Sequence, residues 1–166
     1  EEVFSETFKK FTTWKVDDKP FLKIPYKEAM ERYGIDKPDL RNPLIIQDVT
    51  KCFTNSEFKA FEGKTIKAII VPNGAEQGRK FFDKMTEFAV EEAGAKGLAW
   101  IKYEESNFSG SISKNLKEEE LELIKNKLEL NNNDLVLIVV DKFNTVCNSL
   151  GALRVKVANE LNLIDK

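Results

Sequence analysis

The sequence predicts an α+β fold, with helices near both ends of the chain and strands in its middle. Near both termini, apolar residues recur at spacings of three and four, which is the pattern of one helical face. The middle of the chain holds three short runs rich in β-branched and apolar residues, typical of strands. The middle is therefore expected to be a compact α+β unit, bounded by segments of another domain.

The first 44 residues are expected to contain two helices and no strand. One helical face is formed by Val3, Phe4, Phe8 and Phe11. Glu1 and Glu2 precede this face, where negative charge favours the helix dipole. Two prolines then impose an extended connection, and a second helix over residues 27–33 should stop at Gly34.

Three strands are expected in the middle of the chain. The first covers residues 65–71, which are mostly β-branched or apolar and are followed by turn residues. The second covers residues 98–103 and carries Trp100. The third covers residues 135–140 and is apolar at every position, so it should lie in the centre of the sheet with both of its faces covered.

Helices are expected between and after these strands. The first runs from about 78 to 93, and Gly94 follows it where a left-handed cap is wanted. A second, over residues 118–128, begins with glutamates and ends with lysines, and should cover the same core. The polar segment 106–113 lies between the strand at 98–103 and this second helix. The longest helix is predicted by a stripe of Val146, Leu150, Leu153, Val157 and Leu161.

Composition limits the chemistry that this chain can perform. With 166 residues and 42% hydrophobic content, it is long enough for one sizeable core. It lacks histidine, which is the usual partner of nucleophilic serines and cysteines and a common metal ligand. Cys52 and Cys147 are therefore expected to be free, buried thiols, and no metal site is expected. The net charge of −2 means that any RNA contact must use a local basic patch. No apolar run approaches a membrane span, so we expect a cytoplasmic protein.

Three separated blocks of sequence carry a resemblance to a known family. Residues 32–43 read RYGIDKPDLRNP, residues 94–102 read GAKGLAWIK, and residues 150–154 read LGALR, followed by LNLID at 161–165. In this order they resemble the bacterial-type aspartyl-tRNA synthetase (aspartate-tRNA ligase) family, and the resemblance spans nearly the whole chain.

The resemblance implies a specific layout. Residues 45–142 would be the inserted GAD domain, a two-layer α+β sandwich whose mostly antiparallel sheet is covered by helices on one face. Residues 1–44 would be a flanking segment of the class II catalytic domain, and residues 143–166 a return helix toward it. The arginine-bearing motifs that the family uses for aminoacylation are not found here. We therefore expect an internal fragment that is inactive alone and has no catalytic residue or cofactor.

For the parent enzyme, the resemblance implies attachment of L-aspartate to tRNA through an aspartyl-adenylate, using ATP and Mg. It also implies a homodimer with tRNA as partner and no membrane or DNA partner. The fragment itself would support placement of the tRNA acceptor arm or domain closure. Two alternatives are a stand-alone protein-interaction module, whose sheet or apolar N-terminal flank binds another protein, and the insert of a tRNA-dependent amidotransferase subunit.

Two groups of cations are candidate contacts for tRNA phosphates. Lys37 and Arg41 belong to the first block, which the resemblance places near the arriving acceptor end; Asp36, Pro38 and Asp39 would form a rigid joint there. A simple turn with local salt bridges is the alternative.

The second group, Arg79 and Lys80, lies at a helix start, where backbone amides and two cations could hold a phosphate, or where the side chains could simply be solvated. In addition, Trp100, Tyr103 and Phe108 could stack on unpaired bases or pack into the core.

Overall fold

The computed structural model describes residues 2–13, 16 and 20–164 of the chain. Glu1 and Asp165, which were named above for the helix dipole and for the third sequence block, lie outside the described residues. Within the described part, no helix has both the length and the apolar composition that crossing a membrane requires.

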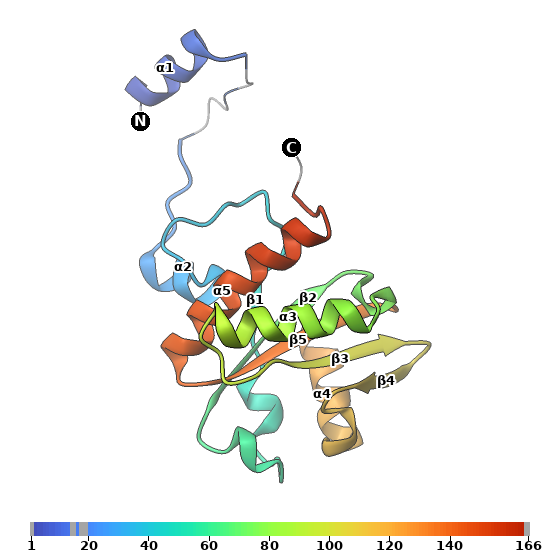
Figure 1. Ribbon diagram of the computed structural model, residues 1–166. Coiled ribbons are helices and arrows are strands. Elements are labelled where there is room, and N and C mark those ends of the chain that lie inside the picture. Colours follow the sequence, from blue (N-terminus) through green and yellow to red (C-terminus); the bar gives the residue numbers. More distant parts are fainter. Residues whose placement is uncertain (1, 14–15, 17–19, 165–166) are drawn as a thin grey trace.

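A five-stranded sheet forms the centre of the fold (Figure 1), and all of its neighbouring strands are antiparallel. In spatial order it contains β1 (Ile46–Asp48), β2 (Thr65–Val71), β5 (Asp134–Asp141), β3 (Ala99–Glu104) and β4 (Asn107–Gly110). The central strand β5 pairs with β2 on one side and β3 on the other, so that Ile138 lies opposite both Ala68 and Ala99. The prediction of a central apolar strand is confirmed.

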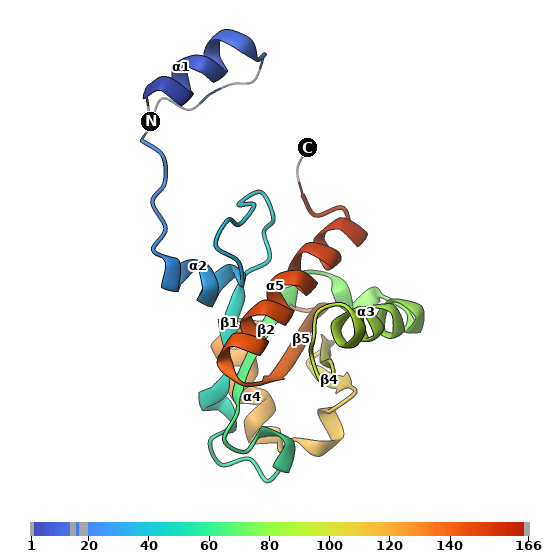
Figure 2. The same cartoon turned by 60° about the vertical axis from the view of Figure 1, so that its left-hand side comes forward.

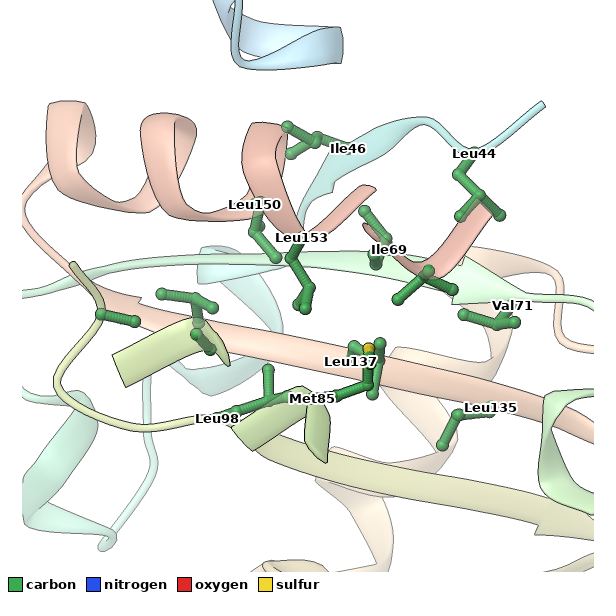
Figure 3. Packing of buried hydrophobic residues seen from close by; sticks show 14 of the residues in the cluster. Leu44, Ile46, Ile69, Val71, Met85, Leu98, Leu135, Leu137, Leu150 and Leu153 are labelled. Carbon is green, nitrogen blue, oxygen red and sulfur yellow. The ribbon is translucent and has the colours of Figure 1, made fainter. Parts of the chain in front are cut away.

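Helices cover both faces of this sheet. The α-helices are α1 (Glu2–Phe11), α2 (Tyr26–Tyr33), α3 (Arg79–Glu91), α4 (Glu118–Leu128) and α5 (Phe143–Glu160). Helices α3 and α5 pack on one face, where Leu137 of β5 meets Met85, Leu150 and Leu153 (Figure 3). The α+β class and the antiparallel sheet are confirmed.

Helix α4 packs on the opposite face, and not on the same core as α3. Val136 and Ile138 of β5 belong to a second cluster, together with Leu121 and Ile124 of α4. Successive residues of a strand point to opposite faces, so a strand that is apolar throughout needs cover on both sides. The continuous apolar sequence of β5, which predicts its central position, therefore also requires helices on both faces of the sheet (Figure 2).

Local signals placed most elements within one or two residues, and helix α2 ends at Gly34 (φ 70°) as predicted. Gly94, after α3, is also left-handed (φ 73°). Strands β1 and β4 were not predicted. Segment 106–113, which the sequence predicts to be a polar connection, contains β4. This strand forms a hairpin with β3 through Glu105 and Ser106, both at positive φ. These two residues lack the asparagine and glycine that usually mark such a turn.

Candidate functional site

The chain from residue 34 to residue 44, which we call the joint segment, links α2 to the start of β1 and lies over α5 (Figures 1 and 2). It begins with a backbone contact between two glycines. A Cβ on Gly34 would lie 2.1 Å from the carbonyl oxygen of Cys147, and a Cβ on Gly151 would lie 2.7 Å from the carbonyl oxygen of Gly34. Neither position has room for a side chain, so α2 ends directly against the backbone of α5.

A buried arginine of α5 holds the rest of the joint segment. The Nη2 group of Arg154 donates to the carbonyl oxygens of Asp39 and Asn42, at 3.0 Å each, and its Nε donates to the carbonyl oxygen of Leu44. The contact is reciprocal, because the Asn42 side chain donates through Nδ2 to the Arg154 carbonyl at 3.2 Å and accepts from the Leu44 amide at 3.0 Å. One guanidinium thus bonds three carbonyls of one irregular segment.

The electrostatics explain why a charge is tolerated at this place. Arg154 is fully buried, and burial lowers the pKa of its guanidinium, an effect opposed by Tyr33 and Asp39. The guanidinium carbon lies 5.0 Å from the centre of the Tyr33 ring, a favourable arrangement for a cation. Arginine keeps its proton even when buried. Its fixed fork therefore satisfies carbonyls that water reaches poorly, although Nη1 has no partner among the described residues.

The predicted joint residues lie on the exposed side of the same segment. Arg41 forms a two-pronged ion pair with Asp39, with Nε to Oδ1 at 3.0 Å and Nη2 to Oδ2 at 2.8 Å, and its backbone amide also donates to Oδ1. These bonds lower the pKa of Asp39 to about 2. Lys37 lies 3.4 Å from Asp36, and Pro38 follows it directly. The exposed side of the joint segment is thus a turn with local ion pairs, and both cations remain open to solvent.

The other candidate cations lie elsewhere. Arg79 and Lys80 begin α3, at a position separate from the joint segment in both views (Figures 1 and 2). Arg79 is almost completely exposed, and its Nε lies 3.6 Å from Asp83 in the next helical turn. In the described part of the chain, no side chain caps the start of this helix. The structure therefore presents two separate positive positions, each on its own element.

The remaining predicted side chains are mostly packed. Trp100 stacks on Phe82 with ring centres 4.2 Å apart, and Tyr103 is buried and lies 5.0 Å from Phe108. Both cysteines are free and buried, as predicted, and burial raises the pKa of each thiol. Among the described residues, no group of three or more acidic, cysteine or histidine side chains could hold a metal ion.

Sequence reasoning missed Arg154 and Asn42, which make the buried half of the site. Two signals pointed to them. Both residues fall inside the blocks that carry the family resemblance. Arg154 also lies four residues after Leu150 and three before Val157, and this spacing places it on the buried face of α5. An arginine at such a position requires buried acceptors.

Comparison with known proteins gives one family match and a set of similar enzymes. The model of the GAD domain family matches residues 55–150, which is more than half of the chain. The aspartate–tRNA(Asp/Asn) ligase of Rickettsia bellii (strain OSU 85-389) is 44% identical over 172 residues, covering 100% of this chain and 28% of that protein. The aspartate–tRNA ligase of Clostridium botulinum (strain Hall) is 48% identical over 152 residues, covering 89% of this chain and 26% of that protein. The chain therefore spans little more than a quarter of the length of these relatives.

Proposed function

Because the chain belongs to the GAD domain family, we propose that it forms the inserted part of an aspartate–tRNA ligase. The resemblance found in the three sequence blocks is confirmed by the family match and by relatives of 41–48% identity. In this proposal the whole enzyme is cytoplasmic and homodimeric. It attaches L-aspartate to tRNA through an aspartyl-adenylate made from ATP with Mg. The present chain supplies no catalytic group to that reaction.

The role proposed for this chain is mechanical support of the acceptor arm of tRNA or of domain closure. The observation that carries it is the bonding of the joint segment by Arg154, which ties residues 39–44 to α5 through three carbonyls. Helix α5 packs on the sheet as well, through Leu150 and Leu153. A displacement of the sheet would therefore move α5, and α5 would move the joint segment and α2 with it, because the hydrogen bonds of Arg154 connect them.

This proposal keeps the predicted division into 1–44 as catalytic-domain flank, 45–142 as insert and 143–166 as return helix. Helix α5 would then serve both parts, since it packs on the sheet and bonds to the joint segment. The exposed positions of Lys37, Arg41, Arg79 and Lys80 support their proposed role as phosphate contacts, because long exposed cations can reach a polyanion without rearrangement of the core.

A tRNA titration at 50 and 200 mM salt tests the RNA contact. Each phosphate contact contributes a slope of roughly −0.7 to −0.9 to the dependence of log K on log salt. The double variant Lys37→Gln/Arg41→Gln should therefore weaken binding and make this slope shallower by about 1 to 2. The control variant Lys51→Gln/Lys114→Gln removes the same charge elsewhere and should leave more of the slope intact. Absence of binding at 50 mM salt would remove these residues as phosphate ligands.

The absence of catalytic function is tested separately. The chain in excess, supplied with aspartate, ATP, Mg and tRNA, is expected to give no charging above background. Aminoacylation above background by this chain would overturn the supporting role.

One observation favours the alternative of a protein-interaction module. The apolar face of α1 is exposed, with Val3 at 77% and Phe11 at 75% of their possible area, and α1 buries no side chain. Exposed apolar faces of this kind mark interaction surfaces. Light scattering at several concentrations distinguishes the two readings, because self-association through α1 predicts a mass that rises with concentration. The amidotransferase insert is a weaker alternative, since the relatives reported above are ligases.

A further inference from the structure

A groove opens on the sheet face opposite the joint segment. Its apolar wall is formed by Phe58, Phe61, Ile112 and Val140, and its volume is about 410 Å³. Ile138 of the central strand lies beneath it and is fully buried. These residues belong to the core cluster on the α4 side, whereas α5 and the joint segment belong to the other face. The groove is therefore separate from the site described above.

The rim of this groove carries positive charge. Lys64 and Lys96 both line it. Lys96 lies 3.3 Å from Asp141, whose side chain is only 6% exposed at the end of β5. The backbone amide of Lys142 donates to Asp141 at 2.8 Å, and this bond, together with Lys96, lowers the pKa of the carboxyl group. Asp141 is thus ionised at neutral pH and keeps the Lys96 ammonium at the rim.

Lys64 is the second cation that lines the groove. Its charge also acts on Asp141, so it lies near the same carboxylate. Among the described residues, no carboxylate forms an ion pair with Lys64. Lys96 is thus paired with Asp141, whereas Lys64 adds a positive charge beside the apolar wall that no ion pair among the described residues compensates.

We propose that this groove binds a small organic monoanion with an aromatic or similarly bulky apolar body, of the aryl carboxylate class. The body would pack against Phe58 and Val140, which are only partly buried, and the carboxylate would pair with Lys64. The volume lies within the range of roughly 300–1,000 Å³ that is usual for small-molecule sites. The single uncompensated charge matches one carboxylate, and a phosphate dianion would leave a surplus negative charge.

The edge-to-face contact of Phe58 with Phe61, at 4.9 Å and 80°, supports an aromatic occupant. An aromatic ring can extend this packing, because such ring arrangements are favourable beyond simple area burial. Gly97 also lines the groove, and apart from its chain neighbours no atom lies within 4 Å of a Cβ built on it, so the space beside it is open.

NMR titration of the full 15N-labelled chain with 2-naphthoate tests the proposal. The largest shifts are expected at the amides of Gly97, Ala99, Ser111 and Ile112, which surround the groove. The neutral analogue 2-naphthamide should bind roughly two- to fivefold more weakly, the range expected for one exposed charge contact. Largest shifts on α1 or on the joint segment would overturn the proposal, as would equal affinity of the two probes.

Variants of Lys64 make the test specific to this rim. Lys64→Gln should abolish the preference for 2-naphthoate over 2-naphthamide, and Lys64→Arg should retain it. Lys27→Gln, which removes an equal charge from the exposed surface of α2, should leave the preference unchanged. A Lys64→Gln chain that still prefers the anion would overturn the assignment of the charge to Lys64. All these side chains are at least partly exposed, so the fold is expected to persist in each variant.

Discussion

Replacing Arg154 by methionine should release the joint segment from α5 and destabilise the fold. Methionine keeps a long apolar side chain but offers no donor. The variant leaves the carbonyls of Asn42 and Leu44 without their buried partner, while the carbonyl of Asp39 is only partly buried and can bind water. Each unsatisfied buried acceptor costs about 1–3 kcal/mol, which gives about 2–6 kcal/mol for the two.

Part of this loss is offset, because the variant no longer buries a charge whose Nη1 lacks a partner among the described residues. We therefore expect a fall of about 3 kcal/mol in the free energy of unfolding, at the lower middle of that range. Urea unfolding at pH 7 measures this value. Hydrogen exchange should show faster exchange of the Leu44 amide, which donates to Asn42 Oδ1 in the intact site.

The matched control is Arg41→Met, in the same segment. Arg41 is exposed and pairs with Asp39 at the surface, so its removal should cost less than about 1 kcal/mol. The reasoning would be refuted if the Arg154 and Arg41 variants had equal stability, or if the Leu44 amide kept its protection in the Arg154 variant. Arg154→Lys should fall between them, since one ammonium cannot span all three carbonyls.

Three further predictions follow from the fold. Gly34→Ala should unfold the chain or destabilise it by more than about 3 kcal/mol in thermal melts, because the new Cβ meets backbone atoms of α5. The control Gly63→Ala, also at positive φ but with open space around it, should cost about 1 kcal/mol. Because the folded pKa of Asp39 is about 2, below its ordinary 3.8, its ionised form stabilises the fold above about pH 4, and this contribution disappears as pH falls toward 2. Urea unfolding of Asp39→Asn should show a smaller loss of stability across that window; an unchanged loss would contradict the assignment. Met85→Ala, in the core, should cost about 2–5 kcal/mol, and Val90→Ala, on the exposed side of the same helix, less than about 1 kcal/mol, both by urea unfolding.

Local patterns were enough for most helices and strands. The run at residues 65–71 coincides with β2, and the helix ends at Gly34 and Gly94 have the left-handed backbone expected of them. These elements depend on the spacing of apolar residues and on the residues at helix ends, and both signals act between positions close together in the sequence. Strand β4 could not be found in this way. It has only four residues, with Phe108 as its one large apolar side chain, and it exists because β3 offers it a free edge to pair with.

The same division applies to the candidate site. The sequence indicated a rigid turn around Pro38, and Asp39 and Arg41 do form a local ion pair only two residues apart. The bonds from Arg154 to Asn42 and Leu44 join positions more than 100 residues apart. No short-range pattern specifies such a contact, and the helical spacing that places Arg154 on the buried face of α5 does not identify the acceptors it bonds.

The sequence by itself determined the family, the α+β class and the central apolar strand, because each of these depends on residue identity and on short-range periodicity. Only the tertiary structure decided which face each helix covers, and that a buried arginine of α5 bonds the joint segment. It also brought Lys64 and Lys96 to one groove and paired Lys96 with Asp141. The physical reason is that burial and charge compensation are properties of the packed chain: a carbonyl or an ammonium lacks a partner only once folding has removed it from water.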